Sequence, residues 1–152
     1  MSREPQPELA LRIVIEDPVP GVRMCLQRGR ADLVEPTDVT PSAVVFDFAV
    51  RLGATRPGGA RTLLGPFTQG PPAGRFVYVN SGRRAGQADS CWDRRAKVPL
   101  SSIPPNQLEA AVSSGTARLE VRIPGRAQDG GPVCASVKLP AAGWRLSRRS
   151  AV

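Results

Sequence analysis

A two-residue period runs from position 44 to position 52, where Val45, Asp47, Ala49 and Arg51 make up the less apolar parity. One parity of this run holds only large apolar side chains: Val44, Phe46, Phe48, Val50 and Leu52. Successive side chains of a β-strand point to opposite faces, so this pattern has the period of a strand and fits a helix badly. The Val and Phe content also favours a sheet. The run therefore predicts a long strand that buries these five side chains in a core.

Shorter runs of the same kind recur along the chain. They predict further strands at residues 9–16, 22–27, 75–79, 95–100, 117–123, 133–139 and 144–146, whereas residues 62–64 have only the pattern of the start of a short strand. The chain contains 16 Pro and 15 Gly among its 152 residues, and this frequency of breakers disfavours long helices. One short helix is predicted near residues 105–113, because prolines precede a run of good helix formers and Gly115 follows it.

About seven or eight short strands with one short helix indicate an all-β fold. We expect an antiparallel β-sandwich or a flattened barrel. A doubly wound parallel sheet is disfavoured, because strands and helices do not alternate along the chain. The predicted organisation is a flexible N-terminal tail over residues 1–8, one β-sandwich domain over residues 9–147, and a flexible C-terminal tail over residues 148–152.

The connections can also be predicted. A five-residue turn, Asp17–Gly21, separates the first two strands, which we expect to form a hairpin. Residues 29–42 and 67–74 show no sustained pattern and are expected to be irregular, and Asn80–Gly82 is expected to be a turn. The strand at 75–79 is apolar on both faces, which is typical of a central position in a sheet.

The chain has no histidine, which excludes Ser-His-Asp and Cys-His catalysis and histidine-ligated metals. Three cysteines, Cys25, Cys91 and Cys134, are an odd number without Cys-x-x-Cys spacing, so neither a disulfide framework nor a thiolate zinc site is indicated. We therefore expect no catalytic residues, no metal and no cofactor. A binding or interaction module is favoured over an enzyme.

The cellular location can be predicted from the composition of the N-terminal residues and the length of the apolar runs. The first seven residues are polar and rich in proline, unlike a signal peptide, and no apolar run approaches the ~20 residues of a membrane span. We expect a cytoplasmic protein that does not enter a membrane.

The net charge of +8 raises the question of nucleic acid binding. Arginine outnumbers lysine 19 to 2, however, and the arginines are scattered along the chain. Neither an aromatic RNA-binding signature nor a recognition helix accompanies them. Weak nucleic-acid binding through surface arginines is thus an alternative that the sequence does not favour.

Several blocks of the sequence resemble a known family. They are Leu11–Pro18, Leu64–Phe67 with Gln69–Pro72, Arg75–Tyr78, Ser90–Trp92, Lys97–Leu100, Asp129–Pro132 and Gly143–Trp144. Together they are similar to an uncharacterised bacterial family, domain of unknown function 5990, over roughly residues 9 to 146. The resemblance implies no activity, cofactor or catalytic residue.

The densest polar stretch runs from Tyr78 to Lys97. The candidate ligand-binding residues in and beside it are Arg75, Tyr78, Asn80, Gln87, Cys91, Trp92, Arg94 and Arg95. Guanidinium groups bind carboxylates and phosphates in a bidentate manner, so this set could hold a small anion against an aromatic ring. The alternative is structural: Trp92 anchors a core, and Arg94 and Arg95 pair with Asp89 and Asp93. The alternative to a binding or interaction module is therefore a carrier of, or an enzyme acting on, a small anionic ligand at the strand–loop–strand region of residues 75–97. A small anionic ligand and a protein partner both stay open as the binding partner.

Overall fold

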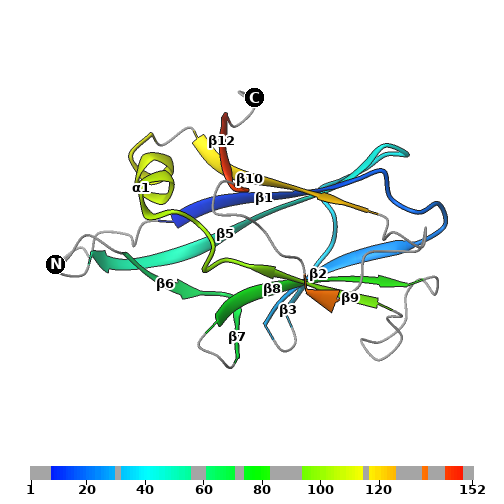
Figure 1. The fold of residues 1–152 in the computed structure, drawn as a ribbon, viewed down its shortest axis with the longest axis horizontal. Helices are drawn as coiled ribbons and strands as arrows, with labels where there is room; N and C mark the ends of the chain where they lie inside the picture. Colours follow the sequence, from blue (N-terminus) through cyan, green and yellow to red (C-terminus); the bar gives the residue numbers. More distant parts are fainter. Residues whose placement is uncertain are drawn as a thin grey trace, which may run out of the picture.

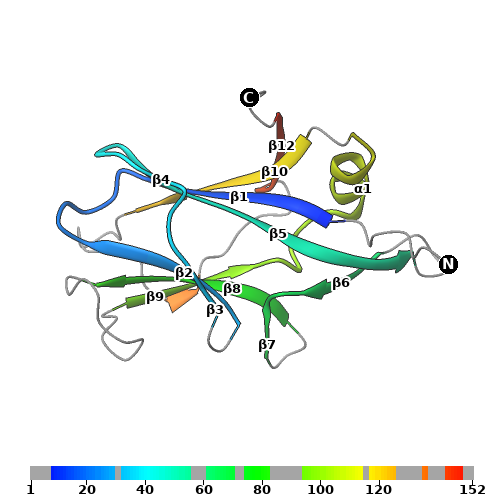
Figure 2. The same ribbon diagram turned by 180° about the vertical axis from the view of Figure 1, so that it is seen from behind.

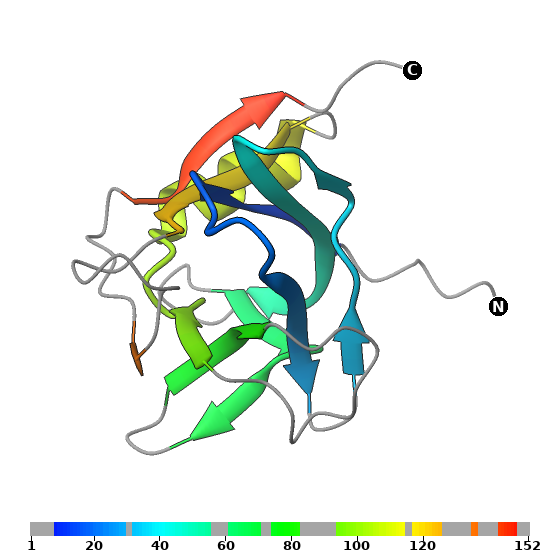
Figure 3. The same cartoon turned by 90° about the vertical axis from the view of Figure 1, so that its right-hand side faces the viewer.

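The computed structural model describes residues 8–29, 32–55, 61–70, 74–82, 94–114, 117–125, 135–136 and 143–148. Within these ranges the chain forms twelve strands and one helix, and the strands make two separate six-stranded sheets. The sheets face each other as two layers, as the view along the molecule shows (Figure 3). The prediction of a mainly-β fold is confirmed, and the architecture is a sandwich and not a flattened barrel.

The first sheet is built around the long strand predicted from the alternating run. Its order is β12 (Arg145–Arg148), β10 (Ala117–Pro124), β1 (Glu8–Glu16), β5 (Ala43–Thr55) and β4 (Asp38–Val39), with β6 (Arg61–Gly65) also paired to β5. Strands β1 and β10 are parallel, and the other pairs are antiparallel.

The second sheet has β8 near its centre. Its order is β11 (Ala135–Ser136), β9 (Arg94–Pro99), β8 (Gly74–Gly82), β2 (Arg23–Gly29) and β3 (Asp32–Val34), with β7 (Thr68–Gly70) also paired to β8. Only β9 and β11 are parallel here. The central position predicted for residues 75–79 is confirmed. The sheets are mostly antiparallel, as predicted, and each contains one parallel pair among its described strands.

The apolar parity of β5 faces the space between the sheets. The five predicted side chains are all buried, and Phe46, Val50 and Leu52 are completely so. Strand β1 pairs with β5 so that Ile13 lies opposite Phe46. These residues form one core cluster with apolar side chains of the second sheet.

Helix α1 (Pro105–Ser114) confirms the one predicted helix. Proline suits its first position, because that position needs no backbone N–H donor. Leu108 and Ala111 are buried in the core cluster, and Val112 packs against it. This i, i+3, i+4 spacing gives the helix one apolar stripe. Figures 1 and 2 show α1 beside β1 and β10 at one end of the sandwich, with β4 at the opposite end.

The expected hairpin of the first two strands is wrong. Strand β1 pairs with β5 and β10, whereas β2 pairs with β3 and β8 in the other sheet. The turn between them crosses from one layer to the other, with positive φ angles at Asp17 and Gly21. The alternation of apolar and polar residues specifies which face of a strand is buried, but it does not specify which strand pairs with it. Two consecutive strands can therefore each bury one face in the same core while they belong to opposite sheets.

Three expected loops are also corrected. Strands β3 and β4 lie within residues 29–42, and β7 lies within residues 67–74; two or three residues are too few to display a period. Residues Asn80–Gly82 belong to β8, because Asn80 pairs with Cys25 on one side and Arg95 on the other. Pairing on both sides outweighs the local turn preference of an Asn-Ser-Gly sequence.

Other expectations lie wholly or partly outside the described residues. These are the tails predicted at residues 1–8 and 148–152, the loop at 56–60, and the strand predicted at 133–139 apart from β11. Of the two predicted tails the structure describes only Glu8 and Arg148, which belong to β1 and β12. The helix of the described part is too short and too polar to cross a membrane.

Candidate functional site

The residues proposed from the sequence are divided between the two faces of β8. Tyr78 and Asn80 lie on the outer face of the second sheet, and Arg75 has the parity of the core residues Val77 and Val79. The backbones of Arg94 and Arg95 lie opposite Ser81 and Asn80. Gln87, Cys91 and Trp92, and the side chains of Arg94 and Arg95, are outside the described part of the structure.

The outer face around Tyr78 and Asn80 is a packed polar layer. Here Asn80 Nδ2 donates to Gln27 Oε1 at 3.1 Å, and both residues are buried. The rings of Phe76 and Tyr78 meet edge to face with centroids 5.2 Å apart, and Lys97 Nζ lies 4.1 Å from the Phe76 centroid. These polar and aromatic side chains are already in contact with one another. The layer is therefore better suited to stabilise the sheet than to bind a ligand.

Gln27 and Lys97 belong to this layer although neither is among the candidates from the sequence. Their register places Gln27 and Lys97 on either side of Tyr78. Lys97 could have been found, because β8 and β9 are consecutive long strands and pair with each other. Gln27 could not, because its strand was assigned to a hairpin with β1.

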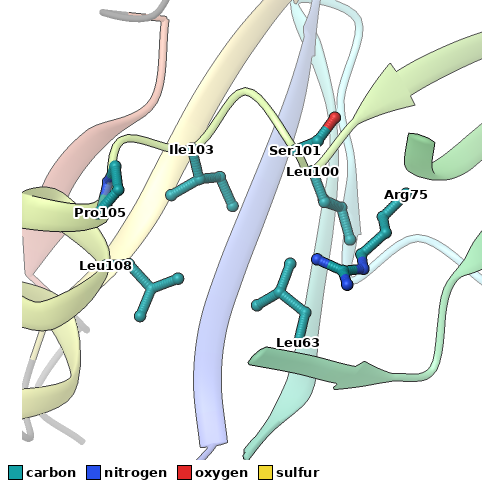
Figure 4. A pocket seen from close by; sticks show the side chains of 7 residues that line it. All are labelled: Leu63, Arg75, Leu100, Ser101, Ile103, Pro105 and Leu108. Carbon is teal, nitrogen blue, oxygen red and sulfur yellow. The ribbon is translucent and has the colours of Figure 1, made fainter. Parts of the chain in front are cut away.

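A pocket lies at the end of the sandwich beside α1, and we call it the end pocket. Its volume is about 160 Å³, and it is lined by Leu63, Arg75, Leu100, Ser101, Ile103, Pro105 and Leu108 (Figure 4). These residues come from β6, β8, α1 and the connection between β9 and α1. Of the candidates from the sequence, Arg75 alone lines it among the described residues.

The connection that forms one wall of the end pocket is held by hydrogen bonds at both ends. Strand β9 ends at Pro99, and the next four residues make a turn closed by the Ile103 N–H donating to the Leu100 carbonyl at 3.2 Å. The Leu100 N–H donates to the carbonyl of Arg75 at 2.7 Å. Ser102 Oγ donates to the Pro99 carbonyl at 2.8 Å and accepts from Trp144 Nε1 at 3.1 Å. The wall is therefore anchored to β8 and to the fully buried Trp144.

The guanidinium of Arg75 is the polar group of this pocket that can bind an anion. Figure 4 shows it extending from β8 toward Leu63 and Leu100. Its Cζ atom lies 5.8 Å from the centroid of the Phe67 ring, a cation–π contact. Gly65, with φ of +118°, turns the chain at the end of β6 just before Phe67, in a conformation that residues with a Cβ rarely adopt.

Arg75 differs from most other described arginines in its partners. Four of them pair with carboxylates, as Arg12–Asp47, Arg23–Glu35, Arg28–Asp32 and Arg122 with Glu16 and Glu120. The hydrogen bonds of Asp47 raise the pKa of Arg12 above its ordinary value. Among the described residues no carboxylate pairs with Arg75, whose guanidinium carries a fork of N–H donors of the kind that binds carboxylates and phosphates.

The aliphatic residues of the end pocket were not identified from the sequence. Leu63, Leu100, Ile103 and Leu108 read as ordinary core positions, and only the packing of β6 and α1 against the end of β8 brings them together. One available signal was the odd spacing of Arg75 and Tyr78. Side chains three residues apart on a strand point to opposite faces, which excludes a common site.

A second hollow lies at the other end of the sandwich, where the β1–β2 turn meets β4. Its volume is about 390 Å³, and its described lining consists of Pro18, Val19, Pro20, Gly21, Val22, Val39, Thr40, Pro41 and Val44. None of these side chains is charged, so the lining offers no group that selects a ligand by charge. In the described part of the chain no three His, Cys, Asp or Glu residues are grouped as metal ligands would be.

A comparison with models of protein families yields a match. The model of a family described as a family of unknown function, DUF5990, matches residues 9–147. No curated protein and no solved structure matches the chain.

Proposed function

This chain belongs to DUF5990, a family of unknown function. From the geometry of the structure we propose that it is a module that binds a small anionic ligand in the end pocket. One observation carries the proposal. The Arg75 guanidinium lines a pocket that is otherwise mainly aliphatic, without a carboxylate partner among the described residues. A partly buried charge is stabilised by an opposite charge, which a bound anion would supply.

The anchored pocket wall supports binding of a ligand without a large rearrangement. Leu100 donates its N–H to the carbonyl of Arg75, so the guanidinium and the facing wall share one hydrogen-bonded frame. A pocket formed in advance saves the entropy of ordering it on binding. Less of the free energy of the Arg75–anion contact is then offset by the cost of ordering the pocket, so the affinity is higher.

Binding is favoured over catalysis by the chemistry of the pocket. Ser101 carries the one hydroxyl of the described lining, and Figure 4 shows this oxygen pointing away from Arg75. A serine nucleophile needs a base within hydrogen-bonding reach, and neither histidine nor a carboxylate is among the described lining residues. The module proposed here therefore holds its ligand unchanged.

We also propose that the module is one domain over residues 9–147 and acts in the cytoplasm. A single core cluster draws on both sheets and on α1, which supports the first statement. The three cysteines of the sequence are an odd number without Cys-x-x-Cys spacing, a usage that indicates no disulfide framework and supports the second statement.

The proposal is tested by thermal unfolding in the presence of acetate, benzoate, phosphate and nucleotides. The variant Arg75→Met removes the cation and retains an extended side chain, and Arg145→Met is the matched control on exposed β12. At least one anion is expected to raise the melting temperature of the wild type and of Arg145→Met but not of Arg75→Met. Stabilisation of none of the three proteins, or equal stabilisation of all three, would overturn the proposal.

A further inference from the structure

We infer that the end pocket selects a monocarboxylate whose apolar body is compact, about the size of one six-membered ring. This inference rests on the proposed function and names the class of anion. It draws on three properties of the pocket: its volume, the position of its cation, and the hydrogen bonds already made at the start of α1.

The volume sets the size of the apolar body. The pocket measures about 160 Å³, and its aliphatic lining residues Leu63, Leu100, Ile103 and Leu108 are each no more than 7% exposed. An apolar cavity of about 150 Å³ lined by such side chains holds one benzene molecule. A body of six or seven carbons would therefore fill the end pocket, whereas acetate would leave most of it empty.

The cation lies toward one side of the lining. In Figure 4 the guanidinium of Arg75 lies near Leu63 and Leu100, while Ile103 and Leu108 lie beyond them toward α1. A ligand with its charge at one end can contact both the guanidinium and the aliphatic side chains of the end pocket. Its carboxylate would meet Arg75, and its apolar body would contact Ile103 and Leu108.

A carboxylate fits this cation better than a phosphate does. One guanidinium offers one bidentate fork and one positive charge, which matches a monocarboxylate. A phosphate has more charge and more acceptor oxygens, and these would face aliphatic side chains. The start of α1 supplies little: Pro105 has no N–H, and the N–H groups of Gln107 and Leu108 already donate to the Pro104 carbonyl.

The experiment compares four probes by calorimetric titration of the wild type. Benzoate carries both features, benzamide lacks the charge, acetate lacks the apolar body, and inorganic phosphate is the other class of anion. Benzoate is expected to bind at least about tenfold more tightly than each of the other three. In Arg75→Met its affinity is expected to fall by at least about tenfold, and in Arg145→Met it is expected to stay unchanged.

A second measurement places the apolar body. The variant Leu108→Phe adds volume inside the end pocket and is expected to weaken benzoate much more than acetate. Methyl NMR of the wild type gives the same information without a substitution. Benzoate should shift the methyl signals of Leu63, Leu100, Ile103 and Leu108 and leave those of Val39, at the other end of the sandwich, in place.

The outcomes separate the two ideas. If phosphate or acetate binds as tightly as benzoate and Arg75→Met abolishes that binding, the inference about ligand class is wrong while the proposed function stands. If no anion binds in a way that depends on Arg75, or if benzamide equals benzoate, both are wrong.

Discussion

The indole N–H of Trp144 donates to the hydroxyl of Ser102 at 3.1 Å, across 42 residues of sequence. Trp144 immediately precedes β12 in the first sheet, and Ser102 follows β9 in the second. Because Ser102 Oγ also donates to the Pro99 carbonyl, one hydroxyl connects the ends of both sheets. The wall of the end pocket thus depends on a residue close to the C-terminus.

Replacing this hydroxyl should destabilise the fold. In Ser102→Ala the Trp144 N–H and the Pro99 carbonyl both lose a partner, and we expect the free energy of unfolding to fall by about 1–3 kcal/mol. Urea denaturation measures the loss. The neighbouring change Ser101→Ala, at an exposed side chain, is the control and should stay within about 0.5 kcal/mol of the wild type. Equal effects of the two variants would contradict the role given to Ser102.

Gly125 allows a close approach of two chain segments beyond the β1–β10 pair. Its N–H donates to the Glu16 carbonyl at 2.6 Å, and a Cβ at this position would lie 2.7 Å from that oxygen and 2.8 Å from Pro18 Cα. Both contacts are with backbone, which cannot rotate away. Gly125→Ala is therefore expected to lower the free energy of unfolding by about 2 kcal/mol or more.

A second glycine provides the matched control for that variant. Among the described residues, a Cβ at Gly29 would meet the Asp32 Cβ alone, at the ordinary distance of 3.9 Å. Gly29→Ala should accordingly change the free energy of unfolding by no more than about 0.5 kcal/mol in chemical denaturation. A loss as large as that of Gly125→Ala would show that the chain merely needs glycine for backbone freedom.

Arg12 and Asp47 form a two-pronged ion pair between β1 and β5. The contacts Nε–Oδ1 and Nη2–Oδ2 measure 2.7 and 2.9 Å, and the side chains are 24% and 30% exposed. Solvent screens such a pair, so a double-mutant cycle with Arg12→Met and Asp47→Asn should give a coupling of about 0.5–1 kcal/mol.

The stabilisation by the Arg12–Asp47 pair is expected to persist at moderately alkaline pH. Asp47 raises the pKa of Arg12 in the folded state above its ordinary value, so the stabilisation is complete below the pKa of an unfolded arginine and is lost only at higher pH. The coupling should therefore be the same at about pH 7 and about pH 9. A coupling that vanishes at the higher pH would refute this assignment.

The buried amide of Asn80 should not tolerate a carboxylate. Asn80 is 0% exposed, and its Nδ2 donates to Gln27 Oε1, so Asn80→Asp loses the donor and places a charge against an oxygen. We expect a loss of about 2–4 kcal/mol in the free energy of unfolding at neutral pH.

Acidification should reverse part of that loss. Burial raises the pKa of the introduced carboxyl, so the folded variant binds a proton that the unfolded chain has already released, and its destabilisation grows as the pH rises above the ordinary carboxyl pKa. Denaturation at about pH 4 and about pH 7 tests this. Asn106→Asp, at an exposed position in the first turn of α1, should show no comparable loss.

The positions of most long strands and of the helix could be predicted from the sequence, but the pairing of the strands could not. Alternation in β5 and the proline start of α1 are local signals, since each depends on residues within one strand or one turn. The hairpin of the first two strands failed because both β1 and β2 bury one face, and a five-residue connection can either return within a sheet or cross to the other. The candidate site from the sequence stays a prediction, but the same limit of local signals applies to two of its members: Arg75 and Tyr78 are close in sequence and lie on opposite faces of β8.

The buried face of each strand can be assigned from the sequence, because successive side chains of a strand point alternately into the core and out to solvent. The sequence also excluded histidine chemistry. The meeting of β6, α1 and the turn after β9 at the inner end of β8 is a feature of the tertiary structure alone; there Arg75 shares the parity of the core residues Val77 and Val79 and lies among aliphatic side chains. That feature depends on contacts between residues far apart in the chain, and no local pattern encodes which strands will be neighbours.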